Sequence, residues 1–458
     1  MSWAPGQKET MVNAKIQQGF LPSVAAACVL MFASTARGQT ATQTCDFLPN
    51  KIYLHGTTAV KPLIAALGAR LAALPNNPYT LLYQQVDACN AVESVIANPP
   101  GNISGRGAPH FYSLAPTPQN PNAYRDDTCS LNSATIINAD VALADVYFSS
   151  CPSSIYVPGS VRDVSDPSSS SAPAVDYLGP TQAMVFITAS SNFTSQYLLL
   201  EEMQDILACG SCARIYPYVD HAQLNLYDAE GGFTNGIPLM TYHCLNVPVT
   251  YYPKSSNCGT FIKTSFYPEP EITIMDKVAR SITPTAAIGF ISGENYDEHR
   301  DTLKSLAIVG PGQTAGRKAY LPDSDALARD RHNVRDGHYV IQGPLHMIAS
   351  AGADNVPTRP MAQRFVNWMR GKPGMPGEAP LPFNIIDVFA QTGVVPECAM
   401  KVIRETECGP FKPYIDPAPC GCYFESQATG LSVPSGCIPC QASTECSNGR
   451  ICSFGFCE

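Results

Sequence analysis

The sequence predicts an α/β protein built from two lobes, followed by a small disulfide-rich C-terminal tail. At 458 residues the chain exceeds what a single hydrophobic core usually organises. Between residue 45 and about residue 400, short apolar runs alternate with amphipathic segments, as in α/β proteins. From Cys420 onward cysteines recur every few residues and apolar residues are scarce, so that segment needs covalent cross-links to hold a shape.

The N-terminal segment reads as an export signal. Lysines precede an apolar stretch over residues 19–33, and small residues at 36–38 suit cleavage before Gln39. The stretch is short for a membrane span, and no comparable segment follows. A lipoprotein acylated at Cys28 is the alternative. We therefore predict that residues 1–38 are a signal peptide and that the protein is periplasmic, extracellular or at the cell surface.

Composition restricts the partners. There are 29 basic and 38 acidic residues, a formal net charge of −9, so most of the surface should repel nucleic acids and anionic membranes. Any anion must then be bound by a local site rather than by the overall field. Eighteen cysteines favour an oxidising compartment and disulfides over zinc, although their pairing does not follow from spacing.

The first informative unit is a strand, a small polar loop and a helix. A strand is expected over residues 51–54, and leucines at helical spacing predict a helix over 61–74. Pro62 suits the first helical turn, where its missing N–H is not needed. The intervening Gly56-Thr57-Thr58 sits where free N–H groups at a helix start favour an anion, although a threonine there is more often a simple cap.

Two further strand ends carry polar residues. An apolar strand over residues 139–144 ends in Asp145, and a strand expected over 247–252 leads through a polar loop into a helix over 261–266. Three such ends, spread over about 200 residues of sequence, fit a cleft between two lobes.

In this order the segments resemble the phosphate-binding (PstS-like) proteins of ABC transporters, which belong to the type 2 periplasmic-binding superfamily. The resemblance extends over most of residues 50–395 and rests on these segments: His55–Pro62, Asp140–Asp145, Asn257–Phe261 and Ala287–Phe290. It implies two α/β lobes joined by hinge crossovers and closing on a ligand. The implied lobes are lobe 1 over 45–177 with a return part over 336–410, and lobe 2 over 178–335. The signal peptide (1–38) and the cysteine-rich tail (411–458) lie outside the resemblance.

The resemblance also implies the ligand-binding residues. They are hydroxyl and backbone donors from each lobe, a cation, and an acid that accepts the proton of hydrogen phosphate. The implied set is Thr57, Thr58, Ala59, Asp145, Lys254, Cys258, Gly259 and Thr260.

Three positions depart from the family pattern. Lys254 replaces an arginine that would bind an anion through two parallel N–H groups. Cys258 replaces a serine hydroxyl, and a thiol is a poor donor. Near Cys89 the family has another ligand serine. Phosphate or a close analogue and another small polar ligand therefore both remain open.

Motifs for catalysis, metals and cofactors are not visible, so we expect no enzyme, no metal site and no cofactor. The acids Glu294, Asp297 and Glu298 read as a solvated turn. Cys244 is expected to pair with Cys258 or with the Cys209/Cys212 couple. The favoured function is capture of a small oxyanion for an ABC permease, a sensor or an envelope partner. The alternatives are a secreted phosphatase-like hydrolase and a ligand-free surface or structural protein.

Overall fold

The computed structural model describes residues 44–458 except 98–106, 118–119, 121, 133–135, 164–171, 190–196, 210–224, 230–233, 249–266, 270, 282–286 and 314–317. Contacts divide the chain into two units, residues 1–41 and residues 42–458. The predicted signal peptide lies outside the described residues. Within the second unit, most strands belong to one twelve-stranded sheet.

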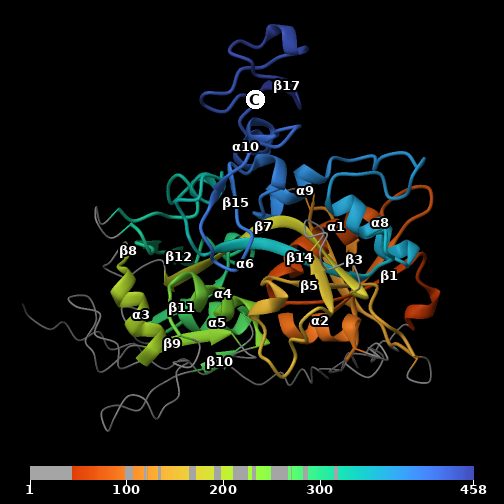
Figure 1. The fold of residues 1–458 in the computed structure, drawn as a ribbon, viewed down its shortest axis with the longest axis horizontal. Helices are drawn as coiled ribbons and strands as arrows, with labels where there is room; N and C mark the ends of the chain where they lie inside the picture. Colours follow the sequence, from red (N-terminus) through yellow and green to blue (C-terminus); the bar gives the residue numbers. More distant parts are fainter. Residues whose placement is uncertain are drawn as a thin grey trace, which may run out of the picture. The chain divides into compact units, whose positions relative to one another are not determined.

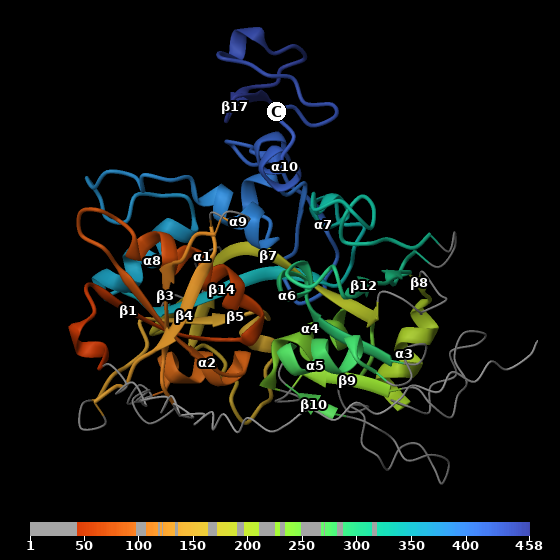
Figure 2. The ribbon, with the colours of Figure 1, turned by 180° about the vertical axis from the view of Figure 1, so that it is seen from behind.

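The first lobe contains three parallel strands, β1 (Lys51–Gly56), β2 (Thr80–Gln85) and β5 (Val141–Ala144), in the order β2-β1-β5. Antiparallel strands β3 (His110–Leu114) and β4 (Tyr124–Thr128) extend its edge. Figures 1 and 2 show helix α2 (Ala88–Ile96) below these strands, and α1 (Lys61–Ala72), α8 (Pro360–Met369) and α9 (Ile385–Thr392) above them. Since helices cover both faces, β5 is entirely apolar and buried, and β1 is mostly buried.

The second lobe repeats this strand order. Its parallel strands β9 (Asn225–Ala229), β10 (Tyr267–Glu269) and β11 (Ala287–Ser292) are arranged β10-β9-β11. Its helices are α3 (Leu200–Cys209), α4 (Gly236–Cys244), α5 (Glu271–Ala279) and α6 (Gly293–Asp297). Short strand β12 (Leu303–Ser305) pairs with β7.

Two long antiparallel strands connect the lobes. β14 (Gln342–Ser350) pairs with β5 of the first lobe and with the first half of β7 (Ala174–Ala189). The second half of β7 pairs with β11 of the second lobe. Each lobe thus consists of a parallel β-strand trio closed by an antiparallel crossover strand. This topology confirms the predicted two-lobed α/β fold with crossover strands between the lobes. The exact lobe boundaries remain predictions.

Close packing at the end of β1 positions the loop that follows. A Cβ on Gly56 would lie 2.7 Å from the Cβ of Leu143 in β5. Glycine is therefore required for β1 and β5 to approach this closely, and any side chain would push the Thr57–Thr58 loop away from the end of β5.

The tail is cross-linked as expected. Helix α10 (Gly421–Thr429) packs on α9, as Figures 1 and 2 show, and Cys398–Cys420 ties it to the body. Three more bridges lie within the tail: Cys422–Cys437, Cys440–Cys452 and Cys446–Cys457. The expected partner of Cys244 is wrong, because Cys244 pairs with Cys408, 164 positions away. Sequence spacing carries no information on a bridge of that length.

Candidate functional site

The loop after β1 brings together two of the predicted residues. Thr57 is buried, and its hydroxyl donates to Oδ2 of Asp145 at 3.3 Å. The Tyr83 hydroxyl donates to the Thr57 carbonyl and fixes the loop from below. Ala59 is fully buried in the 3₁₀ turn η2 (Thr58–Val60), which leads directly into α1. The first-lobe part of the expected site is therefore one compact group at the ends of β1 and β5.

Asp145 follows β5 and is completely buried. Its Oδ1 accepts no hydrogen bond from another described residue. Burial, with a smaller contribution from the nearby Glu271 and Glu407 carboxylates, raises the pKa of Asp145 to about 7, although the Thr57 hydrogen bond acts in the opposite direction. At neutral pH this carboxyl is thus close to half protonated and can either donate or accept a proton.

The start of α4 in the second lobe faces Asp145. Asn235 caps this helix by accepting from the Ile237 N–H at 2.9 Å. A Cβ on Gly236 would lie 1.5 Å from Oδ1 of Asp145, so only glycine allows this contact. Beside it, the Thr234 hydroxyl donates to Asp87, the N-cap residue of α2, at 2.8 Å. Helix starts from both lobes therefore meet at Asp145.

The predicted second-lobe residues are not placed. Lys254, Cys258, Gly259 and Thr260 lie outside the described residues. Within the described part of the chain, the second-lobe helix that approaches Asp145 is α4, preceded by Thr234-Asn235-Gly236, which sequence reasoning missed. The sequence pattern that could have indicated this helix start is Asn235-Gly236 ahead of Ile237, because asparagine is a common N-cap residue. Cys89 offers no thiol, because it is buried and paired with Cys151.

Glu271, the first residue of α5, lies where the Thr58 hydroxyl is expected to meet a ligand. Thr58 donates to its Oε1 at 3.1 Å. Its Oε2 accepts from the Ser292 N–H at 3.2 Å, the Ser292 hydroxyl at 2.9 Å and the Asn295 amide at 2.6 Å. Ser292 caps α6, so this carboxylate sits at the start of a second-lobe helix while also being bound by the first lobe.

The electrostatics of the site are acidic. Burial raises the pKa of Glu271, and the hydrogen bonds from Ser292, Thr58 and Asn295 offset only part of this rise. Asp145 and Glu271 are like charges in a buried setting, so each makes ionisation of the other less favourable. An incoming anion would have to replace the Glu271 carboxylate or meet the acids in protonated form.

The expectation of a solvated turn is wrong for Glu294 and Asp297, whereas Glu298 is exposed. Glu294 and Asp297 are buried in α6. Asp297 is bound by Arg331 and by Arg300, each at 2.6 Å, and Arg331 also binds Asp323 at 2.8 Å. Arg300 lies three positions from Asp297, but Arg331 lies 34 positions away, so local composition at residues 294–298 could not indicate this burial.

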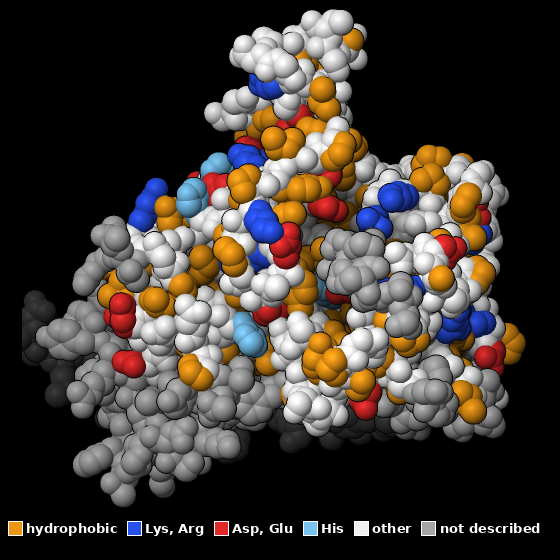
Figure 3. Space-filling model, in the orientation of Figure 1, with side chains coloured by type: hydrophobic (Ala, Val, Ile, Leu, Met, Phe, Trp, Pro, Cys, Tyr) orange, Lys and Arg blue, Asp and Glu red, His pale blue; other side chains and the backbone are white. Residues whose placement is uncertain are grey.

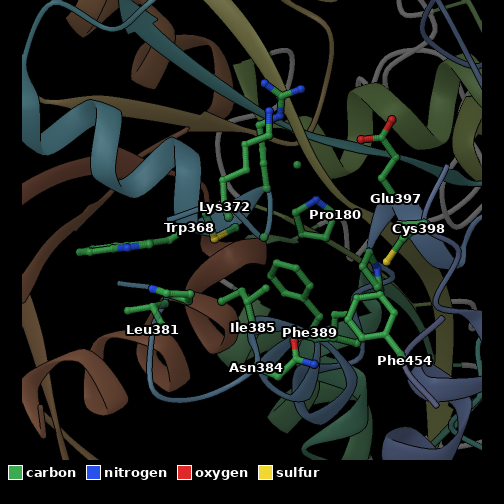
Figure 4. A pocket seen from close by; sticks show the side chains of 18 of the residues that line it. Pro180, Trp368, Lys372, Leu381, Asn384, Ile385, Phe389, Glu397, Cys398 and Phe454 are labelled. Carbon is green, nitrogen blue, oxygen red and sulfur yellow. Dashed lines mark hydrogen bonds between the residues drawn. The ribbon is translucent and has the colours of Figure 1, made fainter. Parts of the chain in front are cut away.

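A cavity of about 650 Å³ lies elsewhere, walled by β7, α8, α9 and the tail. Figure 4 shows Trp368, Leu381, Ile385, Phe389 and Phe454 around it, with Lys372 extending past Pro180. Sequence reasoning assigned no role to these residues. None of the described helices is long and apolar enough to cross a membrane.

No protein-family model and no curated protein matches the sequence. Among solved structures, the fold is similar to a candidate phosphate ABC transporter substrate-binding protein from Clostridium perfringens with bound phosphate (12% identity, 76% of this chain and 99% of that one, TM-score 0.43). It is also similar to an ABC-type phosphate transport receptor from Vibrio cholerae (12% identity, 75% and 99%, TM-score 0.39). A third is the regulatory domain of CcmR from Synechocystis in complex with 2-PG (9% identity, 70% and 95%, TM-score 0.36). These likenesses concern the fold and assign no ligand to this chain.

Proposed function

We propose that this chain is an exported solute-binding protein that captures a small oxyanion of the phosphate class where its two lobes meet. It hands this ligand to an ABC permease, a sensor or an envelope partner, and it catalyses no reaction. The observation that carries the proposal is the binding of the Glu271 carboxylate. One negatively charged oxygen pair receives a hydroxyl from the first lobe and three donors from the second. Donors arranged in this way suit an oxyanion.

Ligand binding proceeds by exchange with Glu271. The donors of Thr58 and Ser292 pass from the carboxylate to the oxyanion, so most hydrogen bonds are replaced rather than lost. Asp145 then accepts the remaining proton of a hydrogen phosphate. A fully ionised sulfate has no such proton, so phosphate and arsenate should bind more tightly than sulfate.

The sharpest test is calorimetric titration of the wild type and Glu271→Ala with phosphate. Removing the internal carboxylate abolishes the competition and the like charge, so the variant should bind phosphate at least about tenfold more tightly. The matched control is Glu202→Gln, since Glu202 is also an acid in the first turn of a second-lobe helix but binds the Leu199 N–H, not the first lobe. The control should leave phosphate affinity unchanged.

The contrary results separate the possibilities. Binding of phosphate by the wild type with no gain in Glu271→Ala would retain the function and remove the exchange with Glu271. No heat with phosphate, arsenate or sulfate in any variant would remove the oxyanion function. Turnover of a chromogenic phosphate ester, lost in Asp145→Asn, would instead favour the phosphatase-like hydrolase.

A second function is favoured by the same carboxylate. With Glu271 satisfied by four donors and Gly236 packed against Asp145, the lobes are held together by the protein's own groups. That arrangement suits a ligand-free surface or structural protein that has kept the fold. Thermal unfolding that is unaffected by every oxyanion, in the wild type and in Glu271→Ala, would support this function over solute binding.

A further inference from the structure

We propose that the cavity between the body and the cysteine-rich tail is a second binding site, which takes a small amphiphile with an apolar body and an acidic head group. A medium-chain carboxylic acid is the simplest such ligand. The site does not depend on the oxyanion function, because its walls share no residue with the Thr57–Asp145–Glu271 group.

The walls supply the apolar part. They are mainly aliphatic, aromatic and proline side chains, contributed by β7, the end of α8, the loop before α9, and α9 itself. The apolar lining residues are Leu178, Pro180, Trp368, Met369, Leu381, Phe383, Ile385, Ile386, Phe389 and Phe454. A volume of about 650 Å³ lies within the range of pockets for drug-sized ligands. Figure 3 shows hydrophobic side chains at the base of the tail on this face.

The charges on the walls are not equivalent, and this sets the sign of the head group. Glu397 and Asp416 share the single hydrogen of the Tyr414 hydroxyl, which lies 2.9 Å from Glu397 and 3.0 Å from Asp416. Arg370 and Lys372, which follow α8, are exposed and form no ion pair with a described residue. The cations are therefore the groups available to a ligand, and they favour a carboxylate.

The tail contributes an aromatic side chain in a strained conformation. Phe454 has φ 48° and Gly455 has φ 84°, forming the two-residue turn between β17 (Cys452–Ser453) and β18 (Phe456–Cys457). A bulky residue with positive φ is an outlier that persists only where surrounding structure enforces it, and such outliers concentrate at binding sites. The bridges through Cys452 and Cys457 hold the two strands of this turn. Phe454 is 44% exposed and its ring lies 5.5 Å from the Tyr423 ring, at the edge of the cavity.

Trp368 provides a direct signal of occupancy. The chain contains two tryptophans, and the other is Trp3. In the full chain carrying Trp3→Phe, emission therefore comes from Trp368 in the cavity wall. Titration with dodecanoate, kept below its micelle concentration, should change this emission saturably. Dodecanol should bind about tenfold more weakly because it lacks the charge, and dodecyltrimethylammonium should not bind. Phosphate should not alter the dodecanoate titration.

Three variants test the parts of the site. Arg370→Gln with Lys372→Gln should abolish the preference for dodecanoate over dodecanol, whereas Arg125→Gln, an exposed cation elsewhere, should not.

Phe454→Asn should bind dodecanoate about tenfold more weakly while unfolding at the same or a higher temperature, since asparagine tolerates positive φ. Lost binding together with a lower unfolding temperature would indicate a merely structural Phe454 and count against the proposal. Equal binding of dodecanol and dodecanoate, or binding of a proline-rich peptide in place of both, would overturn it.

Discussion

Two groups of buried acids differ in how their charge is compensated. In the arginine-paired group, Asp297 and Asp323 are bound by Arg331 and Arg300 at 2.6 to 2.8 Å. In the lobe-junction group, Asp145 and Glu271 are bound by hydroxyl, amide and backbone donors, and among the described residues no cation donates to either of them.

The arginine-paired group is therefore a fixed structural element, whereas the lobe-junction group can exchange its hydrogen-bond partners. The arginine-paired acids join α6 to the segment that precedes β14 through Arg331, whose side chain stays protonated. The acids at the lobe junction have raised pKa values and donors that can be reassigned to another oxyanion. Buried acids without arginine partners therefore mark the place where ligand or proton binding changes the molecule most.

Breaking the arginine-paired group should have the largest effect on stability. Arg331→Met leaves Asp297 and Asp323 buried with less compensation, and the free energy of unfolding should fall by about 3 to 5 kcal/mol. Both side chains carry a Cβ, so the positive φ of 47° at this residue affects the wild type and the variant alike. Denaturant unfolding measures the change. A loss below about 1 kcal/mol would mean that Arg331 contributes little to keeping the two acids buried.

The lobe-junction group should make the stability of the protein depend on pH, because burial raises the pKa of Asp145 in the folded state. The folded-state pKa of Asp145, about 7, lies above the ordinary value of 3.8, so the folded chain holds a proton that the unfolded chain releases. Its ionisation therefore lowers stability as pH rises from about 4 to about 7. Asp145→Asn should be more stable than the wild type above about pH 7, by up to about 4 kcal/mol, and should show no gain below about pH 4.

Paired unfolding curves at these two pH values test this prediction, with Asp323→Asn as the control. Because Asp323 is ion-paired with Arg300 and Arg331, its replacement should destabilise the chain at neutral pH rather than stabilise it. A gain for Asp145→Asn that is the same at both pH values would show that packing, and not ionisation, is responsible.

Breaking an exposed ion pair should have the smallest effect on the free energy of unfolding. Arg280 and Asp276 lie one helical turn apart at the end of α5, 2.8 Å from each other and largely exposed. Solvent screens this pair, so Arg280→Gln should change the free energy of unfolding by less than about 0.5 kcal/mol. Thermal unfolding in low and high salt checks it. A larger, salt-sensitive loss would mean that α5 is held more weakly than its contacts with β11 suggest.

The sequence predicted what depends on neighbouring residues. The strand at residue 51, the helix at residue 61 and the acid at the end of β5 follow from periodicity and turn chemistry. Glu271 was missed because an acid in the first turn of a helix is ordinary and interacts favourably with the helix dipole. Its contact with Thr58 spans 213 positions and depends on how the lobes approach, which no local pattern encodes.

The tail shows the same division. Its cysteine spacing predicted cross-links, and disulfides are present. The position of the Phe454 turn beside the body of the protein was not predictable, because it depends on which cysteines pair. Four cysteines alone allow three pairings, and only the pairing in space selects among them.

The bridge between Cys244 and Cys408 has a consequence for motion. It joins the last residue of α4, whose other end touches Asp145, to the return segment beyond α9. Any widening at Asp145 must therefore drag the chain around Cys408 along with α4, whereas α5, which carries Glu271, has no such covalent anchor among the described residues. Reduction of the Cys244–Cys408 disulfide would remove this restraint from α4. Like α5, α4 could then move without a covalent link to another segment.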